Sequence, residues 1–385
     1  MKLGIVADEF FSRDVGRMGG FGRAARQVAQ IFNRQPQLGV SVVFLAASLK
    51  SNNGSSRARV HDTPLIFYAR EPQYRDRLLQ ENFDLILTID YRPKYSRILE
   101  ILGSTPVIVW VRDPRPPATQ ARLDTLRLPG DEAILPKGIK FIDCRSLSLL
   151  QASPVQPRRP FLLATPAPTL SLHIEDTYGI SGTDCAFLPG VIDMGVGKVK
   201  KSETPRVIFL GRLDPIKRPW LFVELARAFP QVEFLMLGQS HFQGRGGWLT
   251  GQLPANVKML GHIDGEQKVQ LLTSAWVLIN TSIHEAMPIS FLEALACETP
   301  LLSCHNPEGI VSQYGIFTGS SDGDGMSSLP AFASTLAQLI EQHDRRTRLG
   351  QEGRRWVERT HNAITFLSAF DTLCARAGVY RQSPN

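Results

Sequence analysis

Two carboxylates around the start of one predicted helix are the residues of this sequence best placed to do chemistry. Glu285 follows an apolar run at residues 276–280, and Glu293 lies further along the same segment. Pro288 suits the first position of a helix, because its missing N–H would have no partner there. Apolar residues then recur at helical spacing. We therefore place Glu285 in the loop before the helix and Glu293 inside its second turn.

The start of this helix favours an anion, because free backbone N–H groups and the helix dipole point outward there. Carboxylates repel a phosphate, so the two glutamates are expected to accept hydrogen bonds from hydroxyl groups beside that anion. Arg212 and Lys217 add two cations, in a loop directly after the apolar run at residues 207–210. Together a guanidinium and an ammonium offset much of the charge of a diphosphate. A ligand that combines phosphate with many hydroxyls is a nucleotide sugar, and the sequence favours that hypothesis.

The elements that must position these residues alternate between apolar strands and helices in both halves of the chain. Strand candidates lie at residues 3–7, 42–45, 85–89, 107–111, 139–142, 161–163, 207–210, 234–237, 257–261, 276–280 and 300–303. Unbroken apolar runs are typical of parallel strands that are buried on both faces. We predict an α/β fold with two Rossmann-like domains, the first over residues 1–194 and the second over residues 195–361.

Two further segments in the first half follow predicted strands. The glycine cluster Gly19-Gly20-Phe21-Gly22 separates the first strand from the first helix, an order that brings a phosphate close to backbone N–H groups. Its spacing is not G-x-G-x-x-G, and a plain turn explains the glycines equally well. Arg112 and Asp113 directly follow the run at residues 107–111, where open α/β sheets place ligand contacts.

Length and composition exclude several classes of protein. The chain has 385 residues, 43% hydrophobic and 21% charged, which is ordinary for a globular protein of two domains. It has no run of eighteen apolar residues and no signal-peptide pattern, and its five cysteines lack the spacing of metal ligands. We expect a cytoplasmic protein with no disulfide framework and no zinc site.

The net charge of +7 is concentrated in the first half, because residues 1–160 carry 24 Lys and Arg against 15 Asp and Glu. A basic half attracts an anionic membrane, an acidic substrate or nucleic acid. An ordinary solvated surface rich in arginine is an equal alternative. Nucleic acid is not expected as a partner, because the basic residues are not interleaved with base-stacking aromatic residues.

The chain resembles the retaining glycosyltransferases of the GT-B fold, family four (glycosyl transferases group 1). The resemblance extends over nearly the whole length and is strongest at residues 205–310. Its motifs lie at residues 19–22, 188–193, 209–217, 285–293, 294–300 and, more loosely, 307–311. A Glu-x7-Glu element that follows an Arg-x4-Lys loop is specific in combination, although each part is common alone.

This resemblance implies a role for each matching residue. Arg212 and Lys217 would hold the donor diphosphate, with Gly211 in the same loop, and Glu285 would accept hydrogen bonds from the transferred sugar. Glu293 would bind the nucleoside ribose. Further expected contacts to the donor come from Gly20 and Gly22 and from the backbone at Met287, Ile289 and Ser290.

The resemblance also implies an architecture. The two domains would face each other across a cleft, with the first binding the acceptor and the second binding the nucleotide-sugar donor. A C-terminal helix within residues 362–385 would cross back to the first domain. Phe21, Arg112, Asp113 and His284 are candidates for the acceptor or sugar side.

The expected reaction moves a sugar from a nucleotide-diphosphate sugar to a hydroxyl acceptor with retention of configuration. No metal ion and no cofactor are expected, because fixed cations and a helix start already offset the charge of the leaving diphosphate. The acceptor would be a glycan, a lipid-linked molecule or a small molecule. The basic first half allows peripheral contact with the inner face of the membrane.

Three segments depart from the family pattern. Arg112-Asp113 stands where the family often has a His-Asp pair, Ala286-Met287-Pro288 follows Glu285 in place of a glycine motif, and Gly238-Gln239-Ser240 replaces a Gly-x-Gly. These departures leave two alternatives open. One is another GT-B enzyme, such as a sugar-nucleotide epimerase or a glycan phosphorylase, and the other is a catalytically silent scaffold that binds partners.

Overall fold

The computed structural model describes residues 1–10, 19–50, 57–69, 72–130, 143–152, 159–193, 195–239 and 253–380. The predicted strand at residues 139–142 lies outside these ranges. The chain divides into two compact units, each of which is α/β. Unit 1 consists of Met1–Pro116, Ile142–Val191 and Ala363–Asn385, and unit 2 consists of Pro117–Phe141 and Ile192–Asn362.

Unit 1 is built on one sheet, which has eight strands among the described residues, in the order β3-β4-β2-β1-β5-β6-β7-β8. The strands are β1 Lys2–Ala7, β2 Ser41–Ala46, β3 Arg57–Val60, β4 Thr63–Ile66, β5 Leu85–Ile89, β6 Val107–Trp110, β7 Phe161–Thr165 and β8 Ala186–Phe187. Every neighbouring pair is parallel except β3 and β4. The order runs outward from β1 in both directions, as in doubly wound sheets.

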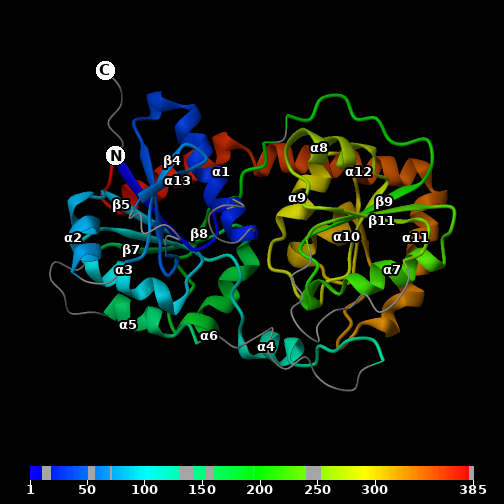
Figure 1. The fold of residues 1–385 in the computed structure, drawn as a ribbon, viewed down its shortest axis with the longest axis horizontal. Coiled ribbons are helices and arrows are strands. Elements are labelled where there is room, and N and C mark those ends of the chain that lie inside the picture. The colour runs from blue at the N-terminus through cyan, green and yellow to red at the C-terminus, as the bar shows by residue number, and fades with distance from the viewer. Residues whose placement is uncertain are drawn as a thin grey trace. The chain divides into compact units, whose positions relative to one another are not determined.

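Helices cover both faces of this sheet because successive side chains of a buried strand point to opposite faces. Leu3 and Ile5 of β1 pack with α1 and α13, whereas Val6 packs with α2, α3, α5 and α6 (Figure 1). The helices are α1 Gly20–Arg34, α2 Gln73–Gln80, α3 Ser96–Ile101, α5 Ser146–Ala152, α6 Ile174–Tyr178 and α13 Ala363–Arg376. Three short 3-10 helices are η1 Pro36–Leu38, η2 Pro93–Tyr95 and η3 Pro168–His173. The prediction that the C-terminal helix returns to the first half is confirmed, since Phe366 and Phe370 lie in the core of unit 1.

Unit 2 contains a second parallel sheet, with six strands among the described residues, in the order β11-β10-β9-β12-β13-β14. The strands are β9 Arg206–Leu210, β10 Glu233–Leu237, β11 Val257–Gly261, β12 Val277–Asn280, β13 Leu301–Ser303 and β14 Gly315–Phe317. The strand order reverses beside β9, where β10 lies on one side and β12 on the other. The loops that follow β9 and β12 carry Lys217 and Glu285, so the candidate site lies at the point where such sheets bind ligands.

Unit 2 contains helices before, between and after its strands. They are α4 Pro117–Leu123, α7 Pro219–Arg227, α8 Gly265–Ser274, α9 Ile289–Ala296, α10 Ile310–Tyr314, α11 Leu329–Glu341 and α12 His343–Thr360. The 3-10 helices are η4 Pro215–Lys217, η6 Pro307–Gly309 and η7 Met326–Ser328. Phe222 of α7 packs against Phe209 and Phe234, with ring centroids 5.8 and 5.0 Å away, and these rings form the centre of the core.

The segment Pro117–Phe141 groups with unit 2, whereas the sequence analysis assigns it to the first domain. Its described part is held there by side chains. Leu123 and Leu126 are buried in the core of unit 2, Arg122 Nε lies 2.7 Å from Asp322 Oδ1, and the Gly323 N–H donates to Thr125 Oγ1 at 2.9 Å. These contacts join residues about 200 positions apart, which local sequence patterns do not reveal.

The helices in the described part of the chain are either too short or too polar to cross a membrane.

Candidate functional site

The loop after β9 is organised by the carboxylate of Asp214. Asp214 caps η4, where its Oδ1 accepts a hydrogen bond from the Lys217 N–H at 3.2 Å. Its Oδ2 lies 3.3 Å from Arg212 Nε, and the Arg212 side chain is 43% exposed. One carboxylate therefore orients both residues that the sequence assigns to the diphosphate, while most of the Arg212 guanidinium stays open to a ligand.

Gly211 begins this loop, and its position depends on a second glycine. A β-carbon at Gly238 would lie 1.8 Å from the Gly211 carbonyl oxygen, which no real side chain tolerates. The Gly211 N–H donates to the Leu237 carbonyl at 3.0 Å, and the Leu213 N–H donates to that of Gln239 at 2.9 Å. The loop after β9 is thus bonded directly to the end of β10, and Gly238 allows the close approach.

Lys217 and Glu285 form a buried ion pair, with Lys217 Nζ 2.5 Å from Glu285 Oε1. The same oxygen accepts hydrogen bonds from Ser282 Oγ at 2.6 Å and from Asn280 Nδ2 at 2.9 Å. Burial by itself raises the pKa of Glu285, but the charge and hydrogen bond of Lys217 and the two neutral donors outweigh it, so the pKa is lowered. Glu285 is therefore an ionised acceptor at neutral pH.

The start of α9 lies directly beyond this pair. Pro288 is the N-cap residue, with an extended backbone at φ −72° and ψ 125°, and the helix begins at Ile289. The prediction that Pro288 occupies the first helical position is therefore wrong by one residue, because the backbone of Pro288 does not take helical angles. Phe291 N–H makes the first bond back into the cap, to the Pro288 carbonyl. The N–H groups of Ile289 and Ser290 precede it and lie at the helix start, which favours an anion.

Glu293 lies in the second turn of α9, as predicted, and it too is paired. Lys268 Nζ of α8 lies 2.8 Å from Glu293 Oε1 and 3.2 Å from Asp264 Oδ1. Glu293 and Lys268 are each 4% exposed. Lys268 holds the Glu293 carboxylate in one position, which is what a residue that accepts hydrogen bonds from a ribose requires.

Arg218 stabilises the loop after β9, and the sequence analysis does not name it as a site residue. Its side chain is fully buried, and it donates to the Thr281 and Ser321 carbonyls at 2.8 and 3.0 Å and to Cys304 Sγ at 3.1 Å. Its backbone has φ 44°, in the left-handed region that residues other than glycine rarely adopt. Thr281 Oγ1 in turn donates to the Lys217 and Arg218 carbonyls at 2.7 and 3.0 Å. These bonds fix the backbone of Lys217.

Two histidines, His284 and His305, lie close to the backbone of Glu285. His305 Nε2 is hydrogen-bonded to the Glu285 carbonyl oxygen, and the His284 ring lies 5.8 Å from the His305 ring. Burial, followed by repulsion from His284, lowers the pKa of His305 to about 4. His305 is therefore neutral at pH 7, and its ring orients the backbone of the loop before α9.

The remaining predicted residues belong to unit 1. Gly20 is the first residue of α1, and the Gly22 N–H donates to Glu9 Oε2 at 3.3 Å. The carboxylate of Glu9 therefore already interacts with the start of this helix. Phe21 is partly buried, with the Arg92 guanidinium 5.3 Å from its ring centroid. The role of Gly20 and Gly22 in donor binding stays a prediction.

Arg112 and Asp113 lie beyond β6 and differ in their contacts. Asp113 Oδ2 accepts hydrogen bonds from Arg115 Nη2 at 2.6 Å and Nε at 3.0 Å. Arg112 is 6% exposed, and its guanidinium stacks on the Trp110 ring, with Cζ 4.4 Å from the centroid. Burial lowers the pKa of Arg112 to about 10, against the charge of Asp90, which acts in the opposite direction.

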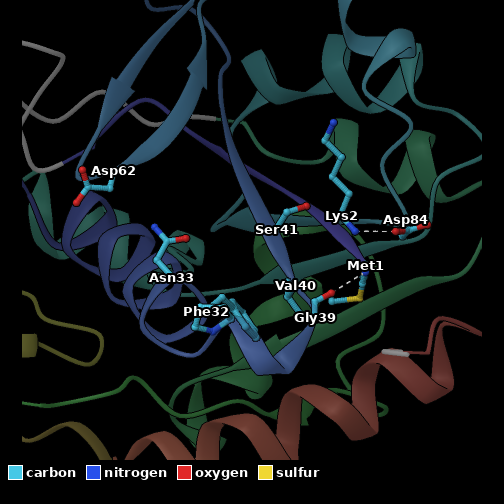
Figure 2. Close-up of a pocket in the computed structure, with 10 residues that line it drawn as sticks. Met1, Lys2, Phe32, Asn33, Gly39, Val40, Ser41, Asp62 and Asp84 are labelled. Carbon is cyan, nitrogen blue, oxygen red and sulfur yellow. Dashed lines mark hydrogen bonds between the residues drawn. The ribbon is translucent and has the colours of Figure 1, made fainter. Parts of the chain in front are cut away.

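A pocket of unit 1 lies at the other end of the strands. It is lined by Met1, Lys2, Val40 and Ser41, at the beginnings of β1 and β2, and by Asp84 before β5 (Figure 2). The amino group of Met1 donates to the Gly39 carbonyl at 2.8 Å, and the Lys2 N–H donates to Asp84 Oδ2 at 2.6 Å. Open α/β sheets bind ligands at the carboxyl ends of their strands, so this pocket is not part of the predicted site.

An Asp-x-Asp segment at residues 322–324 has the spacing of a metal-binding pair, but its carboxylates serve the fold. Asp322 pairs with Arg122, and Asp324 Oδ1 accepts a hydrogen bond from the Met326 N–H at 2.9 Å. Within the described ranges, no group of three or more His, Cys, Asp and Glu residues has the geometry of a metal site.

The structure therefore brings Arg212, Lys217, Glu285 and the start of α9 together in unit 2, and it adds residues that the sequence analysis missed. Asn280 and Ser282 carried a usable signal, since polar residues directly after an apolar strand are typical of ligand sites. Lys268 and Arg218 gave no signal of these contacts, because Glu293 lies 25 positions from Lys268, and the partners of Arg218 lie 63 or more positions away.

The fold that these two units define is the GT-B fold. HepE from Anabaena, solved in complex with UDP-glucose, superposes with a TM-score of 0.71 at 14% identity, covering 97% of this chain and 100% of that chain. Sucrose-phosphate synthase from Thermosynechococcus elongatus superposes with a TM-score of 0.72 at 15% identity, covering 97% and 98%. At these identities the likeness concerns the fold.

The second half of the chain is similar to one known family. Residues 196–356 match the family described as glycosyl transferases group 1, which confirms the resemblance seen in the sequence. The matched segment contains Arg212, Lys217, Glu285 and Glu293. A GDP-mannose-dependent monoacylated alpha-(1-6)-phosphatidylinositol monomannoside mannosyltransferase from Corynebacterium glutamicum is 26% identical over 169 residues. That match spans 40% of this chain and 43% of the relative, so less than half of each protein is compared.

Proposed function

We propose that this protein transfers a sugar from a nucleoside-diphosphate sugar to a hydroxyl acceptor, with retention of the anomeric configuration and without a metal ion. The observation that carries the proposal is the pair of Lys217 and Glu285 at the start of α9, with Arg212 beside it. The family match over residues 196–356 supports the nucleotide-sugar part of the proposal.

The charges of the site suit the departure of a diphosphate. As the bond between the anomeric carbon and the diphosphate oxygen breaks, negative charge grows on the leaving group and positive charge on the sugar. Arg212, Lys217 and the N–H groups at the start of α9 are fixed before the reaction, so they stabilise the leaving group without reorganising. Glu285 is ionised, and its carboxylate accepts hydrogen bonds from sugar hydroxyls.

The acceptor hydroxyl oxygen then bonds to the anomeric carbon on the face that the diphosphate leaves, which retains the configuration. The proton of that hydroxyl moves to a diphosphate oxygen, so the products are the glycoside and the nucleoside diphosphate. This reaction uses no covalent nucleophile, and Glu285 and Glu293 are ion-paired with Lys217 and Lys268.

Binding of the donor is the first test. A thermal-shift screen of UDP, GDP, ADP and their glucose and mannose conjugates will show a higher melting temperature with at least one of them, because a ligand that binds only the folded state stabilises it. GDP-mannose is included because it is named in the description of the Corynebacterium glutamicum relative. A screen without any shift favours a silent scaffold and contradicts the proposal.

Turnover is the second test. With the donor identified, Lys217→Ala and Glu285→Ala will each lower the rate of donor cleavage about a hundredfold or more, which is the usual loss for one preorganised charge contact. The matched control is Lys258→Ala, which removes the exposed ion pair with Glu233 on neighbouring strands of the same unit. Variants of Lys217 and Glu285 with the kinetics of the wild type would contradict the assignment.

We also propose that a basic surface of the first half brings the protein to the inner face of the membrane, where it meets a lipid-linked acceptor. The support is the excess of Lys and Arg over residues 1–160. Sedimentation with vesicles will show binding that rises with the content of anionic lipid and weakens with salt. Equal sedimentation with neutral and anionic vesicles would remove the membrane part of the proposal and leave the transfer reaction untouched.

A further inference from the structure

Arg112 of unit 1 is a buried cation, and one of its nitrogens, Nη1, has no acceptor in the described part of the chain. Its side chain is 6% exposed, and its Nη1 is buried with no hydrogen-bond partner among the residues that the structure describes. An arginine has five N–H donors, and one that is removed from water without an acceptor is costly. We therefore expect Arg112 to have a function that offsets the energetic cost of its burial.

The guanidinium is held in place by packing. It stacks on the ring of Trp110, and the Trp110 Nε1–H donates to the Leu188 carbonyl at 2.9 Å, so the ring beneath it is fixed. Gly190 follows in the same loop, and a β-carbon there would lie 4.0 Å from Arg112 Nη2. The stacking on Trp110 therefore orients the guanidinium.

The nearby carboxylates are already engaged with other groups. Asp113 is held by Arg115, and Asp90 Oδ1 accepts a hydrogen bond from the Tyr178 hydroxyl at 2.5 Å. Asp90 Oδ2 lies 3.5 Å from Arg92 Nη2 and has no hydrogen bond among the described residues. Burial raises the pKa of Asp90. Unlike Arg92 and Arg115, Arg112 has no ion pair among the residues that the structure describes. With a pKa of about 10 it carries its charge at pH 7.

Arg112 also lies where a ligand is expected. It follows β6, and Asp90 follows the adjacent β5, so both residues lie at the carboxyl ends of neighbouring parallel strands. Open α/β sheets bind ligands at this edge. The pocket of Figure 2 is at the opposite end of the strands and plays no part.

We propose that Arg112 is a specificity-determining residue that binds an oxyanion, a carboxylate or a phosphate, on a sugar substrate of this enzyme. The proposal rests on the transfer reaction described above and names the class of one substrate as an acidic sugar. A guanidinium matches both oxyanions with two parallel hydrogen bonds, whereas a neutral hydroxymethyl group leaves its charge unpaired. The acidic sugar is either the group transferred or part of the acceptor.

Matched pairs of ligands test the proposal by titration calorimetry. The donor arm compares UDP-glucuronate with UDP-glucose and GDP-mannuronate with GDP-mannose. The acceptor arm, in saturating UDP or GDP, compares methyl glucuronide and methyl glucoside 6-phosphate with methyl glucoside. In at least one pair the acidic member will bind about tenfold or more tightly than its neutral partner, since a hydrogen-bonded charge contributes at least that much.

Variants of Arg112 assign the effect to this side chain. Arg112→Met will bind the acidic and neutral members of the responsive pair equally, and Arg112→Lys will keep part of the preference because it keeps the charge without the fork. Circular dichroism and the binding of the free nucleoside diphosphate show whether each variant is folded. A preference that persists in Arg112→Met, or no preference in any pair, would overturn the proposal.

The free nucleoside diphosphate separates this inference from the proposed function. If none of UDP, GDP and ADP binds the wild type, the transfer reaction itself is wrong. If one of them binds and the acidic sugars gain nothing from Arg112, only the substrate class is wrong.

Discussion

The two units treat their buried charges in opposite ways. In unit 2, Lys217 and Lys268 each pair with a glutamate on or beside α9, at 2.5 and 2.8 Å. In unit 1, Arg112 is as buried as Lys268 and stacks on an indole with no acceptor for its Nη1 within the described ranges. Paired charges hold a site rigid before the ligand arrives. A buried cation whose donors lack an acceptor lowers the stability of the fold but can raise its affinity for an anion.

The largest expected effect on stability comes from breaking a buried ion pair of unit 2. Lys268→Ala removes the ammonium from a Glu293 carboxylate that is 4% exposed, and loss of one partner of a buried pair costs about 3–5 kcal/mol. The free energy of unfolding, measured by urea denaturation, will fall by this amount. The double variant Lys268→Met with Glu293→Gln will recover part of it, because neither charge is then left behind.

Lys258→Ala is the matched control, because Lys258 also pairs with a glutamate of unit 2 but is 59% exposed. An exposed ion pair contributes at most about 1 kcal/mol. If Lys268→Ala lowers the free energy of unfolding no more than Lys258→Ala does, the buried ion pair of Lys268 and Glu293 does not stabilise the site.

The second effect is a pH dependence that His305 gives to unit 2. Its pKa is lowered by burial to about 4 in the folded protein, so below pH 6.5 the unfolded chain binds a proton that the folded chain does not. The free energy of unfolding will therefore fall by about 2 kcal/mol from pH 7 to pH 5. His305→Asn will lose this slope, and an unchanged slope in that variant would assign the titration to another group.

A third effect compares one glycine from each unit. Gly238→Ala in unit 2 places a methyl group against the Gly211 carbonyl and will lower the free energy of unfolding by about 1–3 kcal/mol. Gly20→Ala in unit 1 meets nothing within 4 Å and will change it by less than about 1 kcal/mol. If thermal denaturation shows equal losses of stability for the two variants, the backbone of the loop after β9 can shift to accommodate the added methyl group.

The smallest expected effect on stability comes from replacing Arg112 of unit 1. Arg112→Met loses the contact with Trp110 but also removes a buried charge, and these opposing terms will leave the free energy of unfolding within about 1 kcal/mol of the wild type. Urea denaturation beside Lys268→Ala makes the contrast direct. A loss as large as that of Lys268→Ala would make Arg112 a structural residue and remove the reason to expect a ligand there.

Most of the fold and half of the site were accessible from the sequence. Most strands of both sheets and the helix that begins after Glu285 were predicted because apolar runs and periodicity are local properties. The short strands β3, β4, β8 and β14 were not among the candidates. Arg212, Lys217 and Glu285 were found because each lies directly after a strand. Pro288 was placed one residue too far into the helix, since the N-cap and the first helical position have different backbone angles but tolerate the same residue. The segment Pro117–Phe141 was placed in the wrong half, because the contacts that hold it are distant in sequence.

The pattern of residues along the chain was enough to establish an α/β protein with a cationic loop and two glutamates around a helix start. Periodicity and strand ends depend on neighbours in the sequence, which any folded arrangement must respect. The tertiary structure alone decided which charges are paired. Lys268 meets Glu293 because α8 packs against α9. Arg112 Nη1 has no acceptor within the described ranges, where Asp90 Oδ1 binds Tyr178 and Asp113 binds Arg115. Such pairing depends on distances of a few ångströms between distant segments, which only packing determines.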